Sequence, residues 1–509
     1  MQNHLDTGAT EQRSSEARKT IVIGTTMINT LIRSTLGPFG MTKLLTCEDK
    51  IKVTNDGATL LKNLVIDSAS ARILINASVS QDWEEGDGTT TIAILASLLV
   101  EEASKLEEIH PIQIIRGYEI ALTKALEVLD SVCFVMRDDD MVALAKTTLN
   151  SKILRCDLQK FAEICVNAIN LIEDREDLNL INIIKTEGEL QQSYLVDGFI
   201  LDKDVIVPTL KNPRILVANT SMDTDKIKIN GAQVNVRSVS ELSQIEDVER
   251  QRMQEKVEKI VGAENGIDVF VNRQIIYDYF LQLFREKNVV AVEHADFEGV
   301  ERLANVLGAK IMSTFDSLND CIGGCEMIEN VHVGEKVMVK FSGLKKGACT
   351  IVLKGSTAEV LDEAERSVHD ALCVLMRVKT EKKLVYGGGA TEMEVALAVN
   401  NVAMRTEGKE SAAILAFANA VQKIPQIIAE NGGFDGEAIK AKLRALHAKG
   451  RRTYGVDVEK GDAGCMKERS VVESLRIKRR IFTAAVEAAS MIIKCDGLIK
   501  CKQRERNRE

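Results

Sequence analysis

Aromatic residues and prolines are scarce in this chain of 509 residues. Phe, Trp and Tyr together make up 4% of the sequence, with one Trp, and there are only five prolines. A core with so few rings has to be filled by aliphatic side chains, and so few prolines leave room for long helices. The composition therefore favours helix-rich packing of Ala, Leu, Ile and Val.

Long apolar runs and positive charge are also lacking. No apolar run approaches the ~18–20 residues that span a membrane, and the N-terminus has no signal-peptide apolar core. The formal net charge is -9, which gives no electrostatic footprint for nucleic acid or for an anionic membrane. We therefore expect neither nucleic acid nor a membrane among the partners of this chain.

Two kinds of site are not supported by the sequence. The eleven cysteines are scattered and odd in number, and the closest pair, Cys321 and Cys325, has no second Cys/His pair at zinc-site spacing nearby. We interpret them as reduced thiols of a cytoplasmic protein. No G-x-x-x-x-G-K-[ST] sequence occurs, so a P-loop ATPase is not supported.

The length and the pattern along the chain indicate several domains. A chain this long exceeds a single hydrophobic core, and about three domains are expected. The apolar share of 45% and the charged share of 28% are those of an ordinary globular protein, and no repeat occurs at a solenoid period. Helical patterns dominate both ends and short β-branched runs appear in the middle, so we expect a multidomain α and α/β fold.

In the N-terminal part, a hairpin is expected to bring two loops together. Lys43–Thr46 and Ile51–Thr54 read as antiparallel strands. Because the start of one lies beside the end of the other, Leu36–Gly40 is expected next to Asn55–Thr59. Two ordinary turns at one end of a hairpin would give the same pattern. The helices predicted in this part are Ser14–Thr35, with Ser14 or Ser15 as its cap, Ser68–Ser80, Thr89–Lys105 and Ile112–Val135.

The middle of the chain alternates between strands and helices. Such alternation argues for an α/β domain with a largely parallel sheet. The very polar segment Ser240–Val261 keeps a helical stripe of apolar residues, and we interpret it as a solvent-exposed helix. The alternating segments between Ile215 and Leu353 include Asp268–Val271, Gln274–Arg285, Val289–Val292 and Phe297–Leu307.

From Thr357 onward the chain reads as nearly all helix. On the helix predicted for Thr357–Met376, Asp370 falls on the polar face, so by its own pattern it is a solvated surface acid. Gly387-Gly388-Gly389 interrupts the helices and permits close approach of another group to the backbone. The basic tail Lys500–Glu509 is expected to be disordered.

The stretch Gly86-Asp87-Gly88-Thr89-Thr90-Thr91 carries the clearest chemistry. It follows an acidic approach and runs into a nearly apolar helical segment, Ile92–Val100. A helix N-terminus with glycines and hydroxyls suits a phosphate, and Asp87 supplies the hard oxygen that Mg²⁺ prefers beside phosphate. The alternative is a glycine turn with a threonine cap before a buried helix.

Taken together, four stretches resemble the nucleotide-binding motifs of the group II chaperonins, in the family's order and over the whole chain. They are TLGPFG at Thr35–Gly40, VTNDGAT at Val53–Thr59, GDGTTT at Gly86–Thr91 and YGGGATE at Tyr386–Glu392. Finer stretches, Asn219–Lys228, Glu293–Phe297 and Leu361–Leu372, resemble one subunit type of the eukaryotic cytosolic chaperonin. The resemblance implies a subunit of a double ring, with eight subunits per ring, that encloses unfolded clients of actin and tubulin type. ATP hydrolysis, with Mg²⁺, would drive the ring.

The resemblance also implies three nested domains. A helical equatorial domain would combine residues 1–140 and 388–509 and bind ATP. An intermediate hinge domain would combine 141–211 and 356–387. An α/β apical domain, 212–355, would bind clients and carry a helical lid protrusion near 240–261. Clients are expected at Asp296–Leu307 and Asn272–Arg285, with Phe297, Val300 and Leu303 as contacts, unless these three only seal their helix to its sheet.

Carried over residue by residue, the motifs imply an ATP site. Asp87 would hold Mg²⁺, Asp56 would help place the attacking water, and Asp370 would orient or deprotonate that water. Lys152 matches a lysine that senses the γ-phosphate, and Gly388 and Glu473 would face the sugar and base. The residues expected to bind ATP or ADP are Leu36, Gly37, Pro38, Asp87, Gly88, Thr89, Thr90, Thr91, Ser151, Lys152, Gly388, Gly389, Glu473 and Lys478.

Three positions depart from the family pattern. Phe39 stands where the family usually has a basic residue, Thr42 where Asp is common, and Glu85 where a small apolar residue precedes the GDGT motif. The retained carboxylates keep hydrolysis in the prediction, while nucleotide affinity is open. A different class of function also stays open: a soluble Mg-dependent ATPase acting on a small molecule bound by the central α/β domain.

Overall fold

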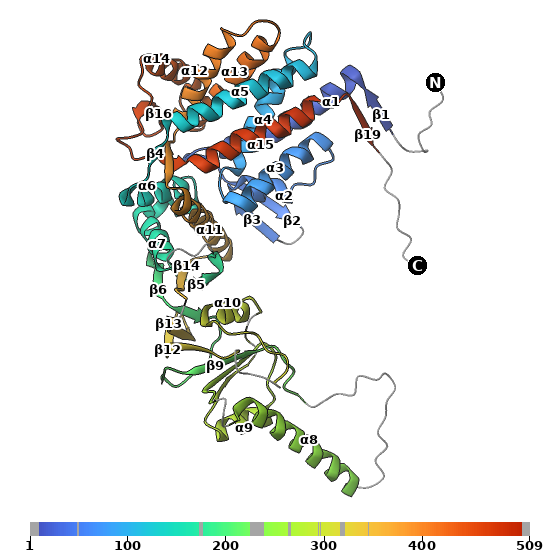
Figure 1. Cartoon of the computed structure of the whole chain (residues 1–509), viewed down its shortest axis with the longest axis vertical. Helices are drawn as coiled ribbons and strands as arrows, with labels where there is room; N and C mark the ends of the chain where they lie inside the picture. Colours follow the sequence, from blue (N-terminus) through green and yellow to red (C-terminus); the bar gives the residue numbers. More distant parts are fainter. Residues whose placement is uncertain are drawn as a thin grey trace. The chain divides into compact units, whose positions relative to one another are not determined.

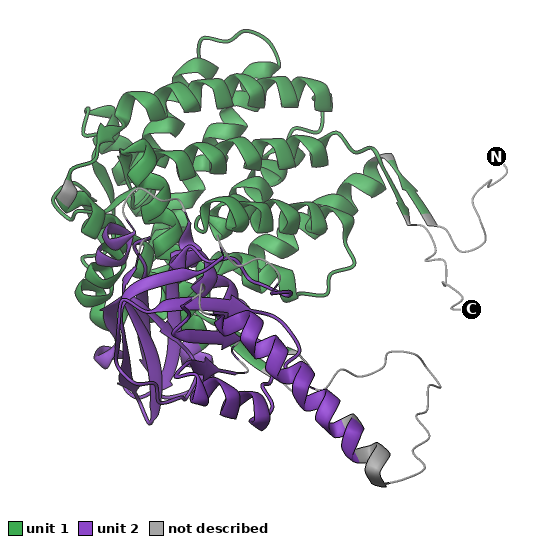
Figure 2. Cartoon of the chain, turned by 60° about the horizontal axis from the view of Figure 1, so that its bottom comes forward, with its two compact units in different colours: residues 1–166, 362–509 green, residues 167–361 purple. Residues whose placement is uncertain are grey.

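The computed structural model describes residues 10–500 except 48–49, 173–176, 224–238, 263–265, 294, 296, 316–320 and 345 (Figure 1). The chain divides into two compact units (Figure 2). Unit 1 combines residues 1–166 and 362–509, and unit 2 is residues 167–361. Two helices, α7 (Leu158–Leu171) and α11 (Ala358–Glu381), carry the chain from one unit into the other. Unit 2 is thus an insertion in unit 1, and the division into three domains stays a prediction.

Unit 1 is built mainly from helices. The two terminal parts of the chain contribute to it together. Its α-helices, apart from those that cross the boundary, are α1 (Ser14–Ile32), α2 (Gly57–Asn63), α3 (Ala69–Glu85), α4 (Thr89–Ser104), α5 (Pro111–Val132), α6 (Asp138–Leu149), α12 (Ala390–Ala403), α13 (Glu410–Asn431), α14 (Gly436–Ala448) and α15 (Leu475–Ile493). Two 3₁₀ helices, η1 (Arg33–Thr35) and η2 (Ile153–Asp157), follow α1 and α6. Helix α1 begins at Ser14 with Arg13 at the N-cap, and no side chain caps it, so the predicted serine cap is wrong.

Helix α4 lies at the centre of this unit. It packs against α1, α3, α13 and α15, and every residue from Ile92 to Val100 is buried. A helix that is apolar on all sides has to be covered on all sides, which is why the other helices surround it. The N-terminus of this helix is the place where the GDGTTT stretch lies, so the core itself fixes that stretch.

Helix α13 is long and apolar enough, by length and composition, to cross a membrane. Most of the relevant window is buried inside unit 1, where α13 packs against α4, α5, α12 and α14. The prediction that no apolar run approaches membrane length is not contradicted, because Lys423 and Pro425 interrupt the apolar run although the helix continues through them. The burial is that of a core helix.

Short strands complete unit 1. The hairpin is confirmed, with Lys43 opposite Thr54. The prediction of nearly continuous helix after Thr357 is wrong, because β15 to β19 lie in that part. The strands are β1 (Thr10–Arg13) paired with β19 (Gly497–Lys500), β2 (Lys43–Cys47) with β3 (Lys50–Thr54), β15 (Lys383–Tyr386) between β4 (Phe134–Val135) and β18 (Val472–Ser474), and β16 (Tyr454–Asp457) with β17 (Asp462–Cys465), all antiparallel. The predicted disorder of the tail lies outside the described residues, apart from Lys500.

Unit 2 is an α/β unit with two sheets. A seven-stranded sheet has the order β11-β10-β9-β12-β13-β7, with β8 also paired to β12, and a three-stranded sheet has the order β5-β14-β6. The strands are β5 (Ile181–Glu187), β6 (Tyr194–Asp197), β7 (Phe199–Leu201), β8 (Leu210–Lys211), β9 (Arg214–Ala218), β10 (Val269–Asn272), β11 (Val290–Val292), β12 (Gly323–Val333), β13 (Lys336–Leu344) and β14 (Cys349–Gly355). The helices are η3 (Leu178–Leu180), η4 (Leu190–Gln192), α8 (Val239–Val261), α9 (Asp278–Glu286) and α10 (Phe297–Leu307).

The larger sheet is mixed, so the prediction of a largely parallel sheet is wrong. Among the described strands of this sheet, β9, β10 and β11 are the ones that pair in parallel, and they belong to the alternating segments recognised in the sequence. The long strands β12 and β13 form an antiparallel hairpin, turned at Gly334. That hairpin lies beyond the alternating segments, and it pairs antiparallel with β7, β8 and β9.

Helix α8 is the predicted polar helix, and it projects from unit 2 in Figures 1 and 2. Its C-terminal part is anchored, because Val257 and Ile260 are buried in the apolar core with Phe270, Phe280 and other residues. Further toward its N-terminus, Val248 is 50% exposed. The interpretation as a solvent-exposed helix is therefore confirmed for the projecting part and wrong for the anchored part.

Candidate functional site

A cavity of about 630 Å³ lies within unit 1, at the N-terminus of α4. The two glycine-bearing loops of the hairpin prediction both line it, together with the first turn of α4, the segment after α6, the triple glycine and the C-terminal strands. The 42 lining residues come from both terminal parts of the chain, and they converge because unit 1 gathers those two parts. The walls are partly polar and partly apolar, as a site for a nucleotide requires.

The turn before α4 is tightly built. Gly86 and Gly88 both have positive φ, 73° and 79°, which favours glycine. A Cβ at Gly88 would lie 2.7 Å from Cδ1 of Ile481. Gln81 donates to the carbonyl of Asp87 at 2.9 Å, and the Asp87 carboxylate accepts from the Gly88 amide at 2.6 Å. Gly88 itself is the N-cap of α4, so the alternative of a threonine cap is wrong, and Thr89, Thr90 and Thr91 all line the cavity.

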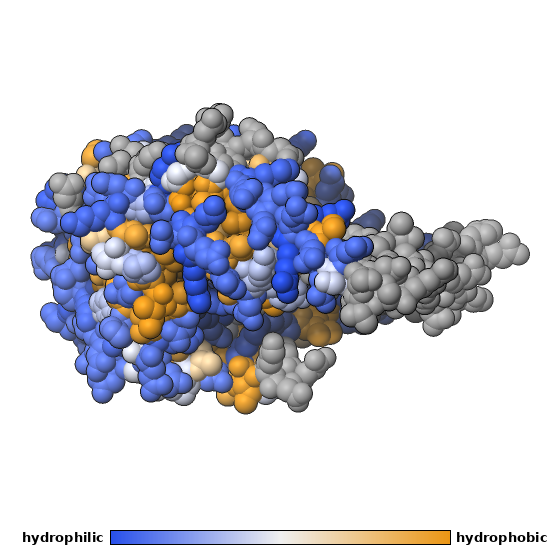
Figure 3. Space-filling model, turned by 90° about the horizontal axis from the view of Figure 1, so that it is seen from below, coloured by the Kyte–Doolittle hydropathy of each residue, from blue (hydrophilic) through white to orange (hydrophobic). Residues whose placement is uncertain are grey.

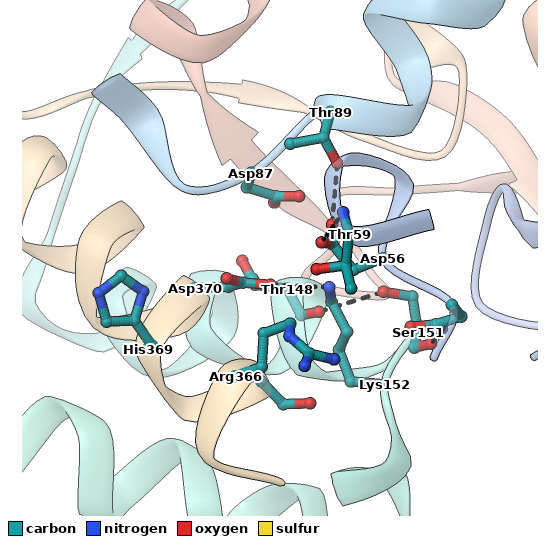
Figure 4. Close-up of polar contacts among 12 residues, drawn as sticks. Asp56, Thr59, Asp87, Thr89, Thr148, Ser151, Lys152, Arg366, His369 and Asp370 are labelled. Carbon is teal, nitrogen blue, oxygen red and sulfur yellow. Dashed lines mark hydrogen bonds and ion pairs between the residues drawn. The ribbon is translucent and has the colours of Figure 1, made fainter. Parts of the chain in front are cut away.

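Asp56 connects α2 to α4. As the N-cap of α2, its carboxylate accepts from the Thr59 amide at 2.9 Å, and it also accepts from the Thr89 hydroxyl at 3.0 Å (Figure 4). Burial alone would raise the pKa of Asp56, but Lys152 and these hydrogen bonds outweigh burial and lower it. Asp56 is therefore held ionised at the wall of the cavity.

Asp370 is buried, which corrects its interpretation as a surface acid. It is 4% exposed, and one of its oxygens accepts from the ammonium of Lys152 at 2.7 Å, across 218 residues of sequence. The polar face of α11 therefore packs against the segment that carries Lys152, where the helical pattern had suggested solvent. Figure 4 shows Asp370 and Lys152 pointing toward one another, with Asp56 and Asp87 above them.

These three carboxylates surround one ammonium. Burial raises the pKa of Asp370 to about 8 and raises the pKa of Asp87, while Lys152 opposes both changes. Burial also disfavours the charged Lys152, but the carboxylates, Asp370 first, outweigh it and raise the pKa of the ammonium. A cation bound beside Asp87 would favour the ionised form of this buried carboxyl, because it would offset the cost of burying the charge.

The other wall of the cavity comes from the triple glycine and the strand β18. Gly388 and Gly389 have positive φ, and a Cβ at Gly389 would lie 2.6 Å from Cβ of Pro425. Lys478 is buried between Glu392 and Glu473, at 2.6 Å from Oε2 of Glu473. These charged groups form a polar patch. They are far from the Lys152 cluster in sequence, but they line the same cavity.

The cavity brings together the predicted ATP-binding residues and Asp56. Asp370 is not among the lining residues and reaches the site through Lys152. The sequence interpretation missed Glu392, Asp457, Met466 and Arg469, which also line the cavity. Glu392 lies in a motif that had been recognised, whereas Asp457 ends the short strand β16, for which the sequence offered only Gly455 and Gly461 as turn signals.

The three departures from the family pattern have different surroundings. Thr42 is exposed and does not line the cavity. Phe39 lines it, and the guanidinium of Arg155 lies 4.3 Å from the centroid of its ring. Glu85 is 1% exposed and one of its oxygens accepts from Arg476 at 2.8 Å, so an ion pair compensates its burial in part.

The predicted client contacts lie on α10 in unit 2. Val300 and Leu303 are buried, 1% and 0% exposed, as the alternative that they seal their helix to its sheet requires. The side chain of Phe297 lies outside the described residues. A role in client binding stays a prediction for these residues, and for Val300 and Leu303 it would require that they become exposed.

Comparison with known proteins finds relatives that match nearly the whole length of the chain. A model of the TCP-1/cpn60 chaperonin family matches residues 28–503. T-complex protein 1 subunit beta of Encephalitozoon cuniculi is 57% identical over 508 residues, covering 100% of this chain and 99% of that protein. The human subunit beta is 44% identical, covering 99% and 97%, and that of Saccharomyces cerevisiae is 44% identical, covering 98% of each. The predicted resemblance to group II chaperonins, and to the beta type among their subunits, is confirmed, and the chain belongs to the TCP-1/cpn60 chaperonin family.

Proposed function

We propose that this chain is a chaperonin subunit that binds Mg-ATP in the cavity of unit 1 and hydrolyses it. The observation that supports this best is the cluster of Asp56, Asp87 and Asp370 around Lys152, at the N-terminus of α4. A helix N-terminus and an ammonium stabilise phosphate charge, and carboxylates hold the metal and the water. Phosphoryl transfer needs little beyond such positioning and electrostatic stabilisation.

Asp87 is the residue that would hold Mg²⁺. Its carboxylate lines the cavity, one oxygen is oriented by the Gly88 amide, and the pKa is raised by burial, so a cation beside it would relieve a buried negative charge. Oxygen ligands of this kind are those that Mg²⁺ takes. When bound, the ion would neutralise charge on the phosphates.

The other residues of the site would contact the nucleotide or the attacking water themselves. Thr89, Thr90 and Thr91 and the amides of the first turn of α4 would bind the phosphates, and Lys152 would contact the γ-phosphate. Asp56 would orient the attacking water, and Asp370 would accept its proton. The remaining contacts to the nucleotide would come from Leu36, Gly37, Pro38, Ser151, Gly388, Gly389, Glu473 and Lys478.

A substitution of Asp87 tests this proposal. Asp87→Ala should abolish Mg²⁺-dependent hydrolysis at this site and weaken nucleotide binding, because the metal loses its protein ligand. The measurement is site-resolved ATP turnover and binding in the assembled complex, with Asp496→Ala, an exposed acid outside the cavity, as the control. Unchanged turnover in Asp87→Ala would rule out the assignment.

We further propose that the chain works in a double ring with other chaperonin subunits, eight per ring, in the cytoplasm. Large apolar side chains exposed on the surface of unit 1 support this proposal, because contacts with other subunits would bury them. Ile23, Met27 and Leu31 are 68%, 40% and 39% exposed and form one stripe along α1. Leu44 and Ile51 are exposed on the two-stranded sheet of β2 and β3, whose outer edges have no partner strand among the described residues.

Unfolded proteins of actin and tubulin type are the proposed clients, and unit 2 is the proposed place of contact. Figure 3 shows apolar side chains gathered among hydrophilic ones on the face seen there. Ile206, Ile275, Tyr277 and Ile311 of unit 2 are between 39% and 78% exposed. Membership of the chaperonin family favours this function over an ATPase acting on a small molecule. Turnover by the isolated chain that responds to a metabolite, without entry into a large particle, would favour that alternative.

A further inference from the structure

Two segments that are far apart in sequence meet at the open edge of the cavity. The first is the loop Leu36–Gly40, where the Gly40 amide donates to the Gly37 carbonyl at 3.0 Å. Asn431 of α13 fixes this loop by donating to the carbonyls of Arg33 and Leu36, both at 2.8 Å. The loop is therefore a rigid part of unit 1.

The second segment is Ser151–Asp157, which carries Lys152 and continues as η2. Lys152 turns inward to Asp370, and three residues later Arg155 lies at the surface. The Arg155 amide donates to the Lys152 carbonyl at 3.2 Å, so the two residues belong to one short turn. A shift of the backbone at Lys152 would therefore be passed to the backbone at Arg155.

Arg155 connects the two segments. Its guanidinium donates to the carbonyl of Pro38 at 3.2 Å and lies 4.3 Å from the centroid of the Phe39 ring. Phe39 is 36% exposed, Arg155 is exposed, and both line the cavity, so their contact lies at its open edge. A guanidinium over an aromatic face is an attractive cation–π contact, and a ring at position 39 is what permits it.

We propose that Arg155 and Phe39 form a latch across the mouth of the cavity, which slows the release of bound nucleotide. The inference rests on the proposed nucleotide site, and it adds that this contact controls the rate at which nucleotide is exchanged. The latch has to separate when a nucleotide leaves past this edge. Because Arg155 shares a turn with Lys152, a change in the contacts of Lys152 changes the latch as well, which links the occupancy of the site to its closure.

The test measures nucleotide release from the full chain. A fluorescent ADP analogue is bound and then displaced by excess unlabelled ADP, for the unchanged chain, Phe39→Leu, Arg155→Gln and the double variant. Leucine keeps an apolar side chain without a π face, and glutamine keeps hydrogen-bonding groups without charge. Arg444→Gln, on an exposed face of α14 outside the cavity, is the control and should release at the unchanged rate.

Each single variant should release the analogue about two- to fivefold faster, the change that corresponds to an exposed cation–π contact of about 0.5–1 kcal/mol. The double variant should release it no faster than the faster single variant, because both substitutions break one contact. Unchanged rates in the single variants, or effects that multiply in the double variant, would overturn the latch.

A second outcome separates the latch from a direct phosphate contact. If Arg155 binds phosphate, Arg155→Gln weakens equilibrium binding of ADP and Phe39→Leu leaves both affinity and release unchanged, which would also overturn the proposal. Failure of the unchanged chain to bind any nucleotide would contradict the proposed function itself. Binding with no effect of Phe39→Leu would contradict only the latch.

Discussion

At the scale of single residues, the charge of Lys152 determines the state of the candidate site. It lowers the pKa of Asp56, and it opposes the rise that burial causes in the pKa of Asp87 and Asp370. Buried charges are tolerated when they are paired, and removing one partner leaves the other uncompensated. Substitutions within this cluster therefore change both the chemistry and the free energy of unfolding, and an experiment has to measure both.

Asp370→Asn is the substitution that separates these two effects. Hydrolysis at this site should fall by roughly two to four orders of magnitude, the usual contribution of a general base. The affinity for ATP should change little, because the phosphates would be held by Asp87, the threonines and the amides of α4. The free energy of unfolding should fall by about 3 kcal/mol, the lower end for a broken buried pair, because Asp56 and Asp87 still face Lys152.

Single-turnover hydrolysis and nucleotide binding, measured on the same assembled complex, test the first two expectations, and denaturant unfolding of the chain tests the third. A variant that loses affinity as strongly as rate would mean that Asp370 forms the pocket. A variant with an unchanged rate would mean that Asp370 only neutralises Lys152.

The burial of Asp370 could not be predicted from its own helix. The pattern of α11 correctly identifies the buried apolar face with Val368, Ala371 and Leu372. It contains no information about what packs on the opposite face, and the partner there is Lys152, 218 residues away. Glycines were more predictable, because the positive φ of Gly86 and Gly88 depends on a local turn.

At the scale of elements, α15 and α11 hold the loop that carries Asp87. Arg476 of α15 pairs with Glu85 at 2.8 Å, and Arg480 pairs with Glu84. Arg377 of α11 donates to the carbonyl of Glu84 at 3.2 Å. The acidic residues before the GDGTTT stretch are thus contacts between helices, and Glu85, unusual for the family, belongs to them.

Arg476→Leu should destabilise the chain by about 1–3 kcal/mol, because it leaves the carboxylate of Glu85 buried without its partner. The double variant Glu85→Ala with Arg476→Leu should recover most of that loss, since the charge and its partner are removed together. Arg479→Leu, on the same helix, breaks a half-exposed pair with Asp130 and should cost at most about 1 kcal/mol. Chemical denaturation of the unchanged chain and of the three variants gives these values. An Arg476→Leu variant as stable as Arg479→Leu would show that the pair with Glu85 contributes nothing.

The elements that were predicted have clear sequence signals, such as regularly spaced apolar residues or turn residues. The elements without such signals were not predicted. The helices around α4 and the hairpin of β2 and β3 follow from apolar spacing and turn residues. The strands β16 and β17 are four residues each, with a glycine in each and no alternation, so only their pairing in the folded unit defines them. The antiparallel arrangement of β12 and β13 likewise depends on their pairing along their whole length. Alternation of apolar and polar residues in a strand does not specify whether its neighbour runs parallel or antiparallel.

At the scale of the whole molecule, the nested order of the chain makes the candidate site possible. The cavity needs residues from 35 to 158 and from 374 to 478, and both parts belong to unit 1, with unit 2 inserted between them. Family resemblance predicted this arrangement, whereas composition showed only where helical and α/β stretches begin and end. The folded unit 1 still leaves an apolar stripe on α1 uncovered, which is unusual for a protein that acts alone.

Met27→Glu, in the middle of that stripe, tests whether α1 contacts another subunit. Ala17, Ile21, Ile28 and Ile32 form the buried side of α1, so a charge at the 40% exposed Met27 should leave the fold of unit 1 intact. In an apolar interface the same charge would be desolvated without a partner, and we expect incorporation into the large particle to fall about tenfold or more. Native mass measurement of the complex, compared with Met404→Glu at the exposed end of α12, gives the result. Normal assembly of Met27→Glu together with normal assembly of the control would show that the stripe faces solvent in the ring, and the contacts between subunits would then have to come from the free strand edges.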